Sequence, residues 1–430
     1  MFILSDLYIY FRYLFRHGIS WRWHTLYWIP TLIIWGGFLL LYLRSGQNLM
    51  AHHAQAVGWF SIFILVNDLP KLLFVLCSLL GLLVQLILRG VALLRFSLFR
   101  SISSHRFSPF RSILPHRFSL FRSISSHRFS LFRSIPSHPV SRWFDRAGVV
   151  AALCCAVGLL YGSLVGVSRL EVKQESYASA DLPAAFRGYR VVQLSDLHLG
   201  SWSGRPEVIQ ELVERCNSLH PDLILFTGDL VNQRSCELEP FVELLSQLRA
   251  TDGIYSVLGN HDYGTYYRWS SPEEARQNLQ HLKQLQEKMG WTLLNNDHRI
   301  IHRGADRIAV VGVENEGEPP FPQYGDLKKA LRGTEGMFRL LLSHNPTHWR
   351  REVLKESDVQ LTLSGHTHAM QCILFGHSLS EFKYPEWRGW YRHGSQSLYV
   401  NIGIGYVGLP FRFNARPEIT LFTWGEASSR

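Results

Sequence analysis

The chain has 430 residues, more than one ordinary domain needs, and its formal net charge at pH 7 is +10. This charge is unevenly distributed. Residues 1–170 carry 17 Arg and Lys against 3 Asp and Glu, whereas residues 171–430 carry 27 against 31. The excess positive charge therefore lies beside the long apolar runs of the N-terminal part, as expected for the flanks of membrane spans. This distribution argues against a nucleic-acid-binding protein, and we expect no nucleic-acid partner.

Three apolar runs in the N-terminal part are long enough to cross a bilayer. They are Leu26–Leu43, Leu72–Leu88 and Ala147–Val167. A shorter apolar run, Val57–Val66, comes before the second of these, and Asn67–Pro70 is predicted to break the helix between them. The shorter run is therefore half of a hairpin, an interfacial helix or an extension of the second span. We predict an integral membrane protein with three or four spans and with membrane lipids as partners.

An internal repeat with a period of 11 residues separates the second span from the third. Its four copies of R-F-S-x-F-R-S-I-x-x-H are Arg95–His105, Arg106–His116, Arg117–His127 and Arg128–His138. The near-identity of the copies indicates recent duplication. The repeat is either a tolerated expansion without a function or a cationic, Phe-rich surface for anionic headgroups. Because such basic loops stay cytoplasmic, we expect residues 171–430 on the outer face of the membrane. A cytoplasmic location of residues 171–430 is the alternative.

Residues 171–430 alternate predicted strands with predicted helices, after a polar connector at Glu171–Arg187. Helices are predicted over Glu207–Ser218, Pro240–Ala250 and Pro272–Met289, where Pro or an acidic residue opens the first turn. Further strands are predicted near Ile308–Val313, Leu398–Ile402 and Ile419–Trp424. This alternation predicts an α/β fold with helices outside stacked strands. Periodicity alone does not distinguish one doubly wound sheet from two sheets.

One predicted strand ends in an acid and an imidazole two residues apart. Val191–Leu194 is predicted to be a buried strand, and Asp196 and His198 follow it. Ligands of open α/β sheets bind beyond the carboxyl ends of the strands. Continued alternation of side chains would place both residues on one side of the chain, within reach of one ion. Taken alone, an Asp-x-His pair is a weak signal of metal binding.

The same construction recurs at four more predicted strands. Their apolar runs are followed by Gly228-Asp229, by Gly259-Asn260-His261-Asp262, by His344, and by Gly365-His366-Thr367-His368. A turn acid or a hydrogen-bonded core histidine explains any one of these, but not all five together. The five blocks combine oxygen donors with imidazoles, and none of them contains a cysteine. The set therefore suits Mn, Fe, Zn or Ni rather than a structural zinc–thiolate site.

These five blocks, in this order, resemble the calcineurin-like metallophosphoesterase superfamily, whose pattern is D-x-H, G-D-x-x-D/N, G-N-H-D/E, H and G-H-T-H. Within the superfamily, the chain resembles the membrane-anchored bacterial YkuE/YaeI-like subgroup, including at Tyr384–Gly389 and Asn401–Tyr406. The resemblance implies a four-layer α/β/β/α sandwich in residues 171–430. An α-helical transmembrane region would precede it in residues 1–170.

The resemblance also implies two divalent metal ions and a ligand set for each. The first ion would be bound by Asp196, His198 and His368, and Asp229 would bridge the two ions. The ligand set of the second ion would be completed by Asn260, His344 and His366.

His261 resembles a histidine of the family that is not a metal ligand. It would give a proton to the leaving oxygen or stabilise charge on the phosphoryl group. Asn232 stands where many phosphatases of the superfamily have an acid. Since an amide supports an imidazolium less well than a carboxylate, the protonation of His261 is open. Asp262 is a candidate for a residue that contacts the ligands without binding a metal ion itself.

The implied activity is hydrolysis of a phosphomonoester, phosphodiester or pyrophosphate bond, because two cations can hold both the attacking and the leaving oxygen. Membrane tethering favours a lipid-linked phosphoester substrate, and UDP-2,3-diacylglucosamine-type pyrophosphate hydrolysis is one candidate. That candidate needs a cytoplasmic active site. The aromatic residues Tyr384, Trp387, Trp390 and Tyr391 form either a packed β-hairpin or a lid over the substrate. The alternative to an enzyme is a non-catalytic membrane scaffold or lipid-binding module with the same fold.

Overall fold

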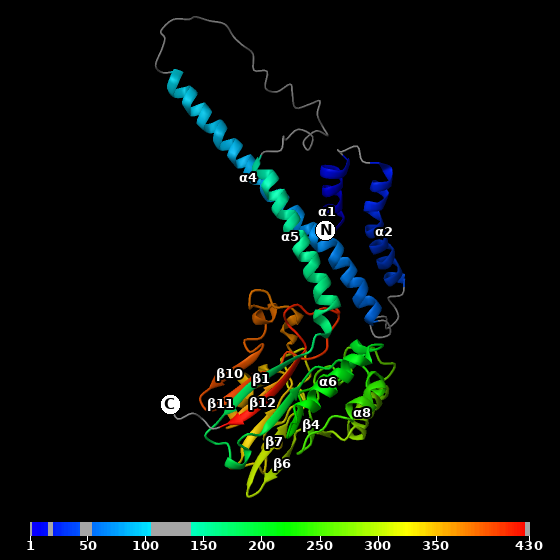
Figure 1. Ribbon diagram of the computed structural model, residues 1–430, viewed down its shortest axis with the longest axis vertical. Helices are drawn as coiled ribbons and strands as arrows, with labels where there is room; N and C mark the ends of the chain where they lie inside the picture. The colour runs from blue at the N-terminus through cyan, green and yellow to red at the C-terminus, as the bar shows by residue number, and fades with distance from the viewer. Residues whose placement is uncertain (1, 16–19, 44–53, 105–138, 426–430) are drawn as a thin grey trace, which may run out of the picture. The chain divides into compact units, whose positions relative to one another are not determined.

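The N-terminal part of the protein is helical. The computed structural model describes residues 2–15, 20–43, 54–104 and 139–425 (Figure 1). The α-helices before residue 165 are α1 (Phe2–Ile9), α2 (Trp21–Leu43), α4 (Ala54–Ser104) and α5 (Pro139–Leu164). Three segments of the described chain are long and apolar enough to cross a membrane: Trp21–Leu41, Gln55–Arg95 and Pro139–Ser168. The first repeat copy continues α4 as far as Ser104, and the other three copies lie outside the described residues.

The helix break predicted at Asn67–Pro70 is wrong, because α4 runs through Pro70. The apolar run Val57–Val66 therefore extends the second span. A proline removes one backbone hydrogen bond, but an apolar spanning helix tolerates this loss when its neighbours satisfy the freed groups. The polar residues near this point make contacts between helices. Lys71 of α4 pairs with Asp6 of α1 at 2.8 Å, and Thr31 of α2 donates to the same carboxylate at 2.7 Å.

The chain divides into two compact units. The first unit comprises Met1–Tyr42 and Phe63–Gly158. The second, here called the α/β unit, comprises Leu43–Ile62 and Leu159–Arg430, and it contains all five motif blocks. The last turns of α5 therefore belong to the α/β unit, where they lead into the first strand.

Two six-stranded mixed sheets form the frame of the α/β unit. The first sheet has the order β1 (Glu171–Ala178), β12 (Glu418–Gly425), β2 (Arg190–Leu194), β3 (Leu223–Phe226), β4 (Ile254–Ser256) and β5 (Thr292–Leu293). The second sheet has the order β10 (Gly389–His393), β11 (Gln396–Val400), β9 (Leu361–Ser364), β8 (Phe338–Leu342), β7 (Asp306–Gly312) and β6 (Asp297–Arg303). In the first sheet β2, β3, β4 and β5 run parallel, and in the second β7, β8, β9 and β11 do.

Three apolar cores separate four layers. The middle core lies between the sheets and joins residues such as Leu225 of β3 to Leu340 of β8. A second core packs the first sheet against α6 (Pro206–Ser218), α7 (Val242–Leu245) and α8 (Pro272–Lys288). A third packs the second sheet against α9 (Leu327–Leu331) and the segment around α10 (Leu354–Glu356). The four-layer α/β/β/α prediction is therefore confirmed. Because both faces of each sheet are covered, the parallel strands are continuous apolar runs.

Several local predictions for the α/β unit need correction. The polar connector predicted at Glu171–Arg187 is wrong over its first half, since β1 occupies Glu171–Ala178 and pairs in parallel with β12. That pairing uses a strand more than 200 residues away, which no local pattern reveals. The helix predicted at Pro240–Ala250 is shorter, because only Val242–Leu245 is α-helical. Of the aromatic stretch, Trp390 and Tyr391 lie in a β-hairpin, in β10, which is antiparallel to β11, whereas Tyr384 and Trp387 precede it.

Candidate metal centre

The five motif blocks meet where parallel strands of both sheets end. Asp196 follows β2, Asp229 follows β3 and Asn260 follows β4, and these three strands are parallel neighbours. His344 follows β8 and His366 follows β9, which are parallel neighbours in the other sheet. Carboxyl ends of parallel strands share one edge of a sheet, so each sheet presents its set of side chains at one edge.

Direct hydrogen bonds join these edges across the two sheets. The amide of Gln193 donates to the carbonyl of Ser364 at 2.9 Å, and the backbone N–H of His366 donates to the Asp196 carboxylate at 3.0 Å. The glycine of the Gly-His-Thr-His block is required at this junction, because a Cβ on Gly365 would collide with Ser195 and Asp196. The junction therefore brings the two sets of motif residues together.

Most of the candidate ligands have left-handed backbone conformations. The φ angles are 52° at Asp196, 45° at His198, 60° at Asp229, 75° at His366 and 50° at His368. Residues with side chains rarely adopt this region, and such strain is concentrated at functional sites. The expectation that strand alternation aligns Asp196 with His198 is therefore wrong. Both residues lie beyond β2 in a turned segment, and the turn, not the pleat, brings their side chains together.

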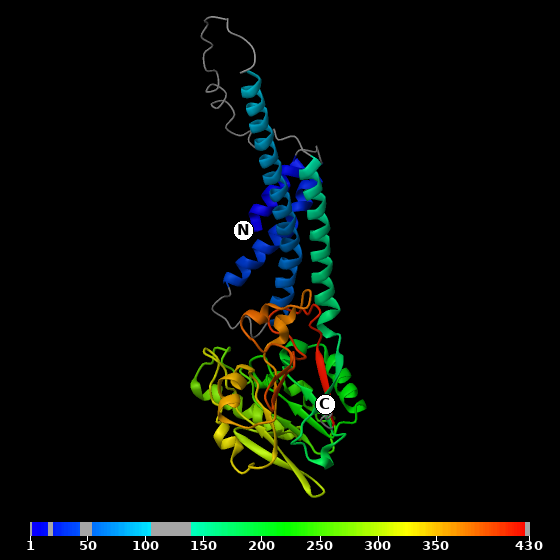
Figure 2. The same ribbon diagram turned by 90° about the vertical axis from the view of Figure 1, so that its left-hand side faces the viewer.

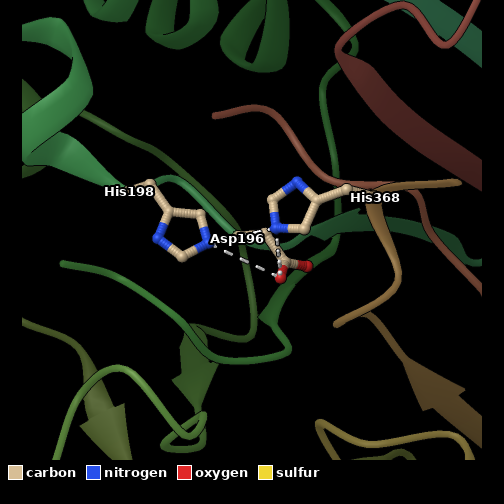
Figure 3. A group of neighbouring side chains, drawn as sticks. All are labelled: Asp196, His198 and His368. Atoms are coloured by element: carbon tan, nitrogen blue, oxygen red, sulfur yellow. Dashed lines mark hydrogen bonds and ion pairs between the residues drawn. The ribbon is translucent and has the colours of Figure 1, made fainter. Parts of the chain in front are cut away.

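A first group of donors consists of Asp196, His198 and His368. Figure 3 shows both imidazoles directed at the Asp196 carboxylate. Nε2 of His368 lies 3.2 Å and Nε2 of His198 lies 3.9 Å from Oδ1 of Asp196, and the two Nε2 atoms are 3.1 Å apart. Asp196 and His198 are fully buried. One carboxylate oxygen and two imidazole nitrogens thus converge on one point, a donor set that suits a transition-metal ion.

A second group consists of Asp229, His344 and His366. Nε2 of His344 lies 3.2 Å from Oδ2 of Asp229 and 3.3 Å from Nδ1 of His366. Nδ1 of His344 donates to the carbonyl of Thr227 at 2.7 Å, which leaves Nε2 free to face the group. Oδ2 of Asp229 also lies 3.7 Å from Nε2 of His198 in the first group. The carboxylate of Asp229 therefore stands between the two groups.

Asn260 has the geometry of an additional oxygen donor. Its side chain is 2% exposed, and its amide Nδ2 donates to the hydroxyl of Tyr266 at 3.0 Å. Its Oδ1 has no hydrogen-bond partner among the described residues, although buried polar atoms almost always have one. A cation beside Oδ1 would supply that missing partner. The residues at this site therefore fit a bound metal ion, on an observation independent of the motif.

His261 is held by backbone groups of the same site. Its N–H donates to Oδ1 of Asp229 at 2.8 Å, and its ring Nδ1 lies 2.6 Å from the carbonyl of Asn232. The side chain of Asn232 points elsewhere, because its Oδ1 accepts from Ser201 N at 3.1 Å and its Nδ2 donates to Ser201 Oγ at 2.9 Å. Asn232 was expected to act on His261 through its side chain, but it contacts the ring of His261 through its backbone carbonyl. His261 also forms a third donor group with His198 and Asp229.

Asp262 organises the loop that carries Asp229. Its carboxylate accepts the backbone N–H groups of Asp229 at 2.9 Å, Gly259 at 2.9 Å and Leu230 at 2.8 Å. Burial, followed by the charge of Asp229, raises the pKa of Asp262 to about 7. Because the carboxylate faces backbone and not the donor groups, its contacts orient Asp229.

The candidate ligands have strongly shifted pKa values. Burial disfavours the charged form of Asp196, but positive charge on His368 and His344 outweighs it and brings the pKa of Asp196 below its ordinary value. Burial likewise disfavours the charged form of His344, yet the adjacent Asp229 raises its pKa to about 9. Burial and the charge of His344 lower the pKa of His366 to about 3. Such opposed shifts among clustered groups are characteristic of functional sites.

Two residues contact this site without belonging to its motif. The hydroxyl of Tyr384 lies 2.9 Å from Nε2 of His366, and the guanidinium Nη2 of Arg412 lies 3.0 Å from Nδ1 of His368. The sequence singled out Tyr384 only as part of an aromatic stretch. Arg412 was missed altogether, because an arginine between two phenylalanines carries no recognisable signal.

The comparisons with known proteins agree with this geometry. Residues 189–370 match the calcineurin-like phosphoesterase family, and residues 1–167 match the transmembrane domain of a probable calcineurin-like phosphoesterase. The uncharacterized metallophosphoesterase YkuE of Bacillus subtilis is 30% identical over 282 residues, which cover 63% of this chain and 91% of that protein. The chain therefore belongs to the calcineurin-like metallophosphoesterase family. The match to the transmembrane domain makes it a membrane protein of this family.

Relatives are found in animals and in bacteria. A transmembrane protein with a metallophosphoesterase domain from Danio rerio is 34% identical over 285 residues, 64% of this chain and 62% of that protein. The UDP-2,3-diacylglucosamine pyrophosphatase LpxG of Chlamydia trachomatis is 28% identical over 332 residues, 65% of this chain and 98% of that protein. The chain thus spans less than two thirds of the Danio rerio relative.

Proposed function

We propose that this protein is a membrane-anchored phosphoesterase that uses two divalent metal ions to hydrolyse a phosphoester or pyrophosphate bond in a lipid-linked substrate. The observation that carries the proposal is the position of Asp229. Its Oδ2 lies 3.2 Å from His344 in one donor group and 3.7 Å from His198 in the other. A carboxylate between two sets of imidazoles is the arrangement that a bridged pair of cations requires.

The proposed ligand sets follow the two donor groups. Asp196, His198 and His368 would hold one ion, and His344, His366 and the orphaned Oδ1 of Asn260 would hold the other, with Asp229 shared. Mixed imidazole and oxygen donors suit Mn, Fe, Zn or Ni. When bound, such ions act as Lewis acids that neutralise charge on a phosphoryl group and lower the pKa of water.

The chain's own residues would position the ions and move the proton. Asp262 fixes the loop of Asp229 through three backbone N–H groups, and Thr227 selects the tautomer of His344 that leaves Nε2 free. His261 is the candidate for protonating the leaving oxygen. Its Nδ1 is held by the carbonyl of Asn232, so Nε2 is the nitrogen available for the substrate. A backbone carbonyl accepts from the ring as a carboxylate would, but it supplies no full negative charge.

A lipid-linked substrate is supported by the membrane-spanning helices and by one relative. LpxG, at 28% identity, is a UDP-2,3-diacylglucosamine pyrophosphatase by name. A substrate of that type would require a cytoplasmic catalytic domain, whereas the basic repeat loop favours the outer face of a bacterial inner membrane. Protease accessibility of the α/β unit in sealed vesicles of known orientation would separate these two arrangements.

The decisive experiment is a substrate screen with purified full-length protein in detergent and added Mn. Phospholipids, lipid-linked nucleotides, water-soluble phosphomonoesters and bis-p-nitrophenyl phosphate would be compared. The Asp229→Asn variant serves as the inactive reference. We expect metal-dependent turnover that the variant loses. If the protein binds lipid but releases no phosphate, alcohol or nucleoside monophosphate from any substrate, it is a non-catalytic scaffold that keeps the fold.

A further inference from the structure

One loop of the α/β unit exposes large apolar side chains in a cluster. Met370, Leu374, Phe375, Leu379 and Phe382 are 54%, 53%, 100%, 66% and 90% exposed. Between residues 169 and 425, the other exposed large hydrophobic residues of the described chain are Tyr266, Tyr324 and Val407, at 48%, 54% and 38%. Isolated apolar residues on a surface are ordinary, but five within 13 positions mark a binding surface. We call the segment from Met370 to Phe382 the apolar loop.

The apolar loop is held in shape by its own contacts. Ser378 Oγ donates to the carbonyl of Ala369 at 2.6 Å, and Leu374 and His377 exchange backbone hydrogen bonds at 2.8 and 2.9 Å. Four consecutive residues where the loop leaves the metal centre, from His368 to Gln371, have φ angles between 43° and 60°. Such a left-handed stretch costs free energy at each residue. The chain therefore enters the loop through a strained turn at the metal centre.

The apolar loop lies beside the end of a predicted membrane span. Ile373 N donates to Phe413 O at 2.9 Å, and Phe413 N donates to Gln371 O at 2.9 Å. The neighbouring Arg412 N donates to the carbonyl of Gly162, in the last turns of α5, at 3.0 Å. The span Pro139–Ser168 ends a few residues later. Figure 2 shows the loop (orange) next to the red segment that precedes β12. A bilayer that contains this span would have its surface close to the loop.

The two ends of the apolar loop are tied to the candidate metal centre. His368, a proposed ligand, lies two residues before Met370. Tyr384, whose hydroxyl is 2.9 Å from Nε2 of His366, lies two residues after Phe382. The apolar loop thus begins and ends next to the metal centre and lies between that centre and the surface of the α/β unit nearest the end of the span.

We propose that the apolar loop inserts Phe375, Leu379 and Phe382 into the lipid surface and thereby brings the metal centre to phosphoesters held in that surface. The part of this inference that concerns phosphoesters in the lipid surface rests on the proposed function. Insertion of the loop into lipid does not. Contact with lipid removes the exposed apolar area from water, and the spans already hold the unit at a bilayer. The occupant is therefore lipid and not a second copy of the chain.

Site-directed spin labelling of the full-length protein in phospholipid vesicles tests insertion without any assay of activity. A nitroxide at Phe375→Cys would be compared with one at Ala305→Cys, in a chain whose six native cysteines are replaced by alanine. Ala305 lies in the exposed turn between β6 and β7, at the end of the α/β unit opposite the loop (Figure 1). We expect the label at 375 to collide more with oxygen and less with a water-soluble nickel chelate than the label at 305.

Two results of this labelling would overturn the inference. Equal accessibility of both labels to the nickel chelate would show that the loop stays in water. Protection of position 375 from oxygen and from the chelate together would show a protein contact, such as a second copy. Neither result depends on whether the protein hydrolyses anything, so failure of insertion is distinguishable from failure of the proposed function.

A second measurement tests what insertion is for. The double variant Phe375→Asp/Phe382→Asp places charges on the exposed tips and leaves the core and the proposed ligands unchanged. Hydrolysis of soluble bis-p-nitrophenyl phosphate should be unchanged, and hydrolysis of a phosphoester embedded in vesicles should fall on the order of tenfold or more. Equal rates of wild type and variant on the embedded substrate would contradict a role in substrate access. Equal loss on both substrates would show that the loop supports the site itself.

Discussion

Nη2 of the buried Arg412 lies 3.0 Å from Nδ1 of His368, so a guanidinium faces the back of a proposed metal ligand. A guanidinium only donates hydrogen bonds, so Nδ1 accepts and the proton of a neutral ring lies on Nε2, which faces Oδ1 of Asp196 at 3.2 Å. An ion at Nε2 would take the place of this proton, whereas metal-binding histidines ordinarily keep a proton on the other nitrogen and donate it to a carboxylate or carbonyl. Arg412 also donates to the carbonyls of Gly405, Ile402 and Ala415. It thereby ties the ring of His368 to the segment before β12.

We predict that Arg412→Lys weakens metal binding by about 10–100-fold, the usual effect of losing a residue that orients metal ligands. Arg412 holds the segment before β12, whose Ile404 and Gly405 N–H groups donate to the carbonyls of Ser195 and Asp196. A lysine keeps the positive charge but cannot form the same set of directed hydrogen bonds. Titration of the metal-free protein with Mn against a competing chelator measures the affinity directly. Arg339→Lys is the matched control, because Arg339 is also buried but contacts Thr334 and Asp358 instead of a ligand. Unchanged affinity in a folded Arg412→Lys protein would refute the positioning role.

Asp229 should be the most damaging single ligand to lose. Asp229→Asn removes the negative charge between the two donor groups, and we expect fewer than two metal ions per chain and turnover near background. Metal content measured after gel filtration, with and without prior chelator treatment, checks this. Asp222→Asn is the control, since Asp222 lies at the opposite end of β3 and contacts Arg190 and Arg303. Two bound ions and near-normal turnover in Asp229→Asn would exclude a bridging role.

His261→Ala should keep both ions bound and slow hydrolysis. If His261 protonates the leaving oxygen, the loss should be about 10²–10⁴-fold for an alkyl alcohol and much smaller for p-nitrophenol, which departs as an anion. A purely electrostatic role would slow both substrates equally. The measurement is a pair of rates together with the metal stoichiometry. Since His261 also lies in a donor group with His198 and Asp229, loss of an ion from the variant would reassign it as a ligand.

Tyr384→Phe should weaken binding of the ion at His366, by up to about 10-fold, because the hydroxyl no longer orients the ring through Nε2. Thermal unfolding with and without Mn reports this as a smaller metal-induced rise in Tm. Tyr391→Phe is the control seven residues further along the chain, where the hydroxyl accepts from Trp387 N at 3.0 Å. A Tm rise equal to that of wild type would show that Tyr384 has no orienting role.

Residue order was enough to predict the strands that carry the motif blocks. A short, continuous apolar run is typical of a strand that is buried on both faces of a sheet. The polar residues that follow such a run are then expected beyond the carboxyl end of the strand, at the edge of the sheet. For this reason the positions of Asp196, Asp229, Asn260, His344 and His366 relative to β2, β3, β4, β8 and β9 were predictable from residue order alone. The separation into a membrane part and an α/β part followed equally from composition, because water and lipid select different residues.

How these sheet edges meet depends on contacts between residues far apart in the sequence. The left-handed turns at Asp196 and His198, the backbone contact between Asn232 and His261, and the guanidinium behind His368 all depend on neighbours distant in sequence. The parallel pairing of β1 with β12 and the passage of α4 through Pro70 are of the same kind. At the left-handed turns and at Pro70, contacts across the fold outweigh a local preference of about 1–3 kcal/mol. Such contacts leave no periodic trace in the sequence, and the structure alone reveals them.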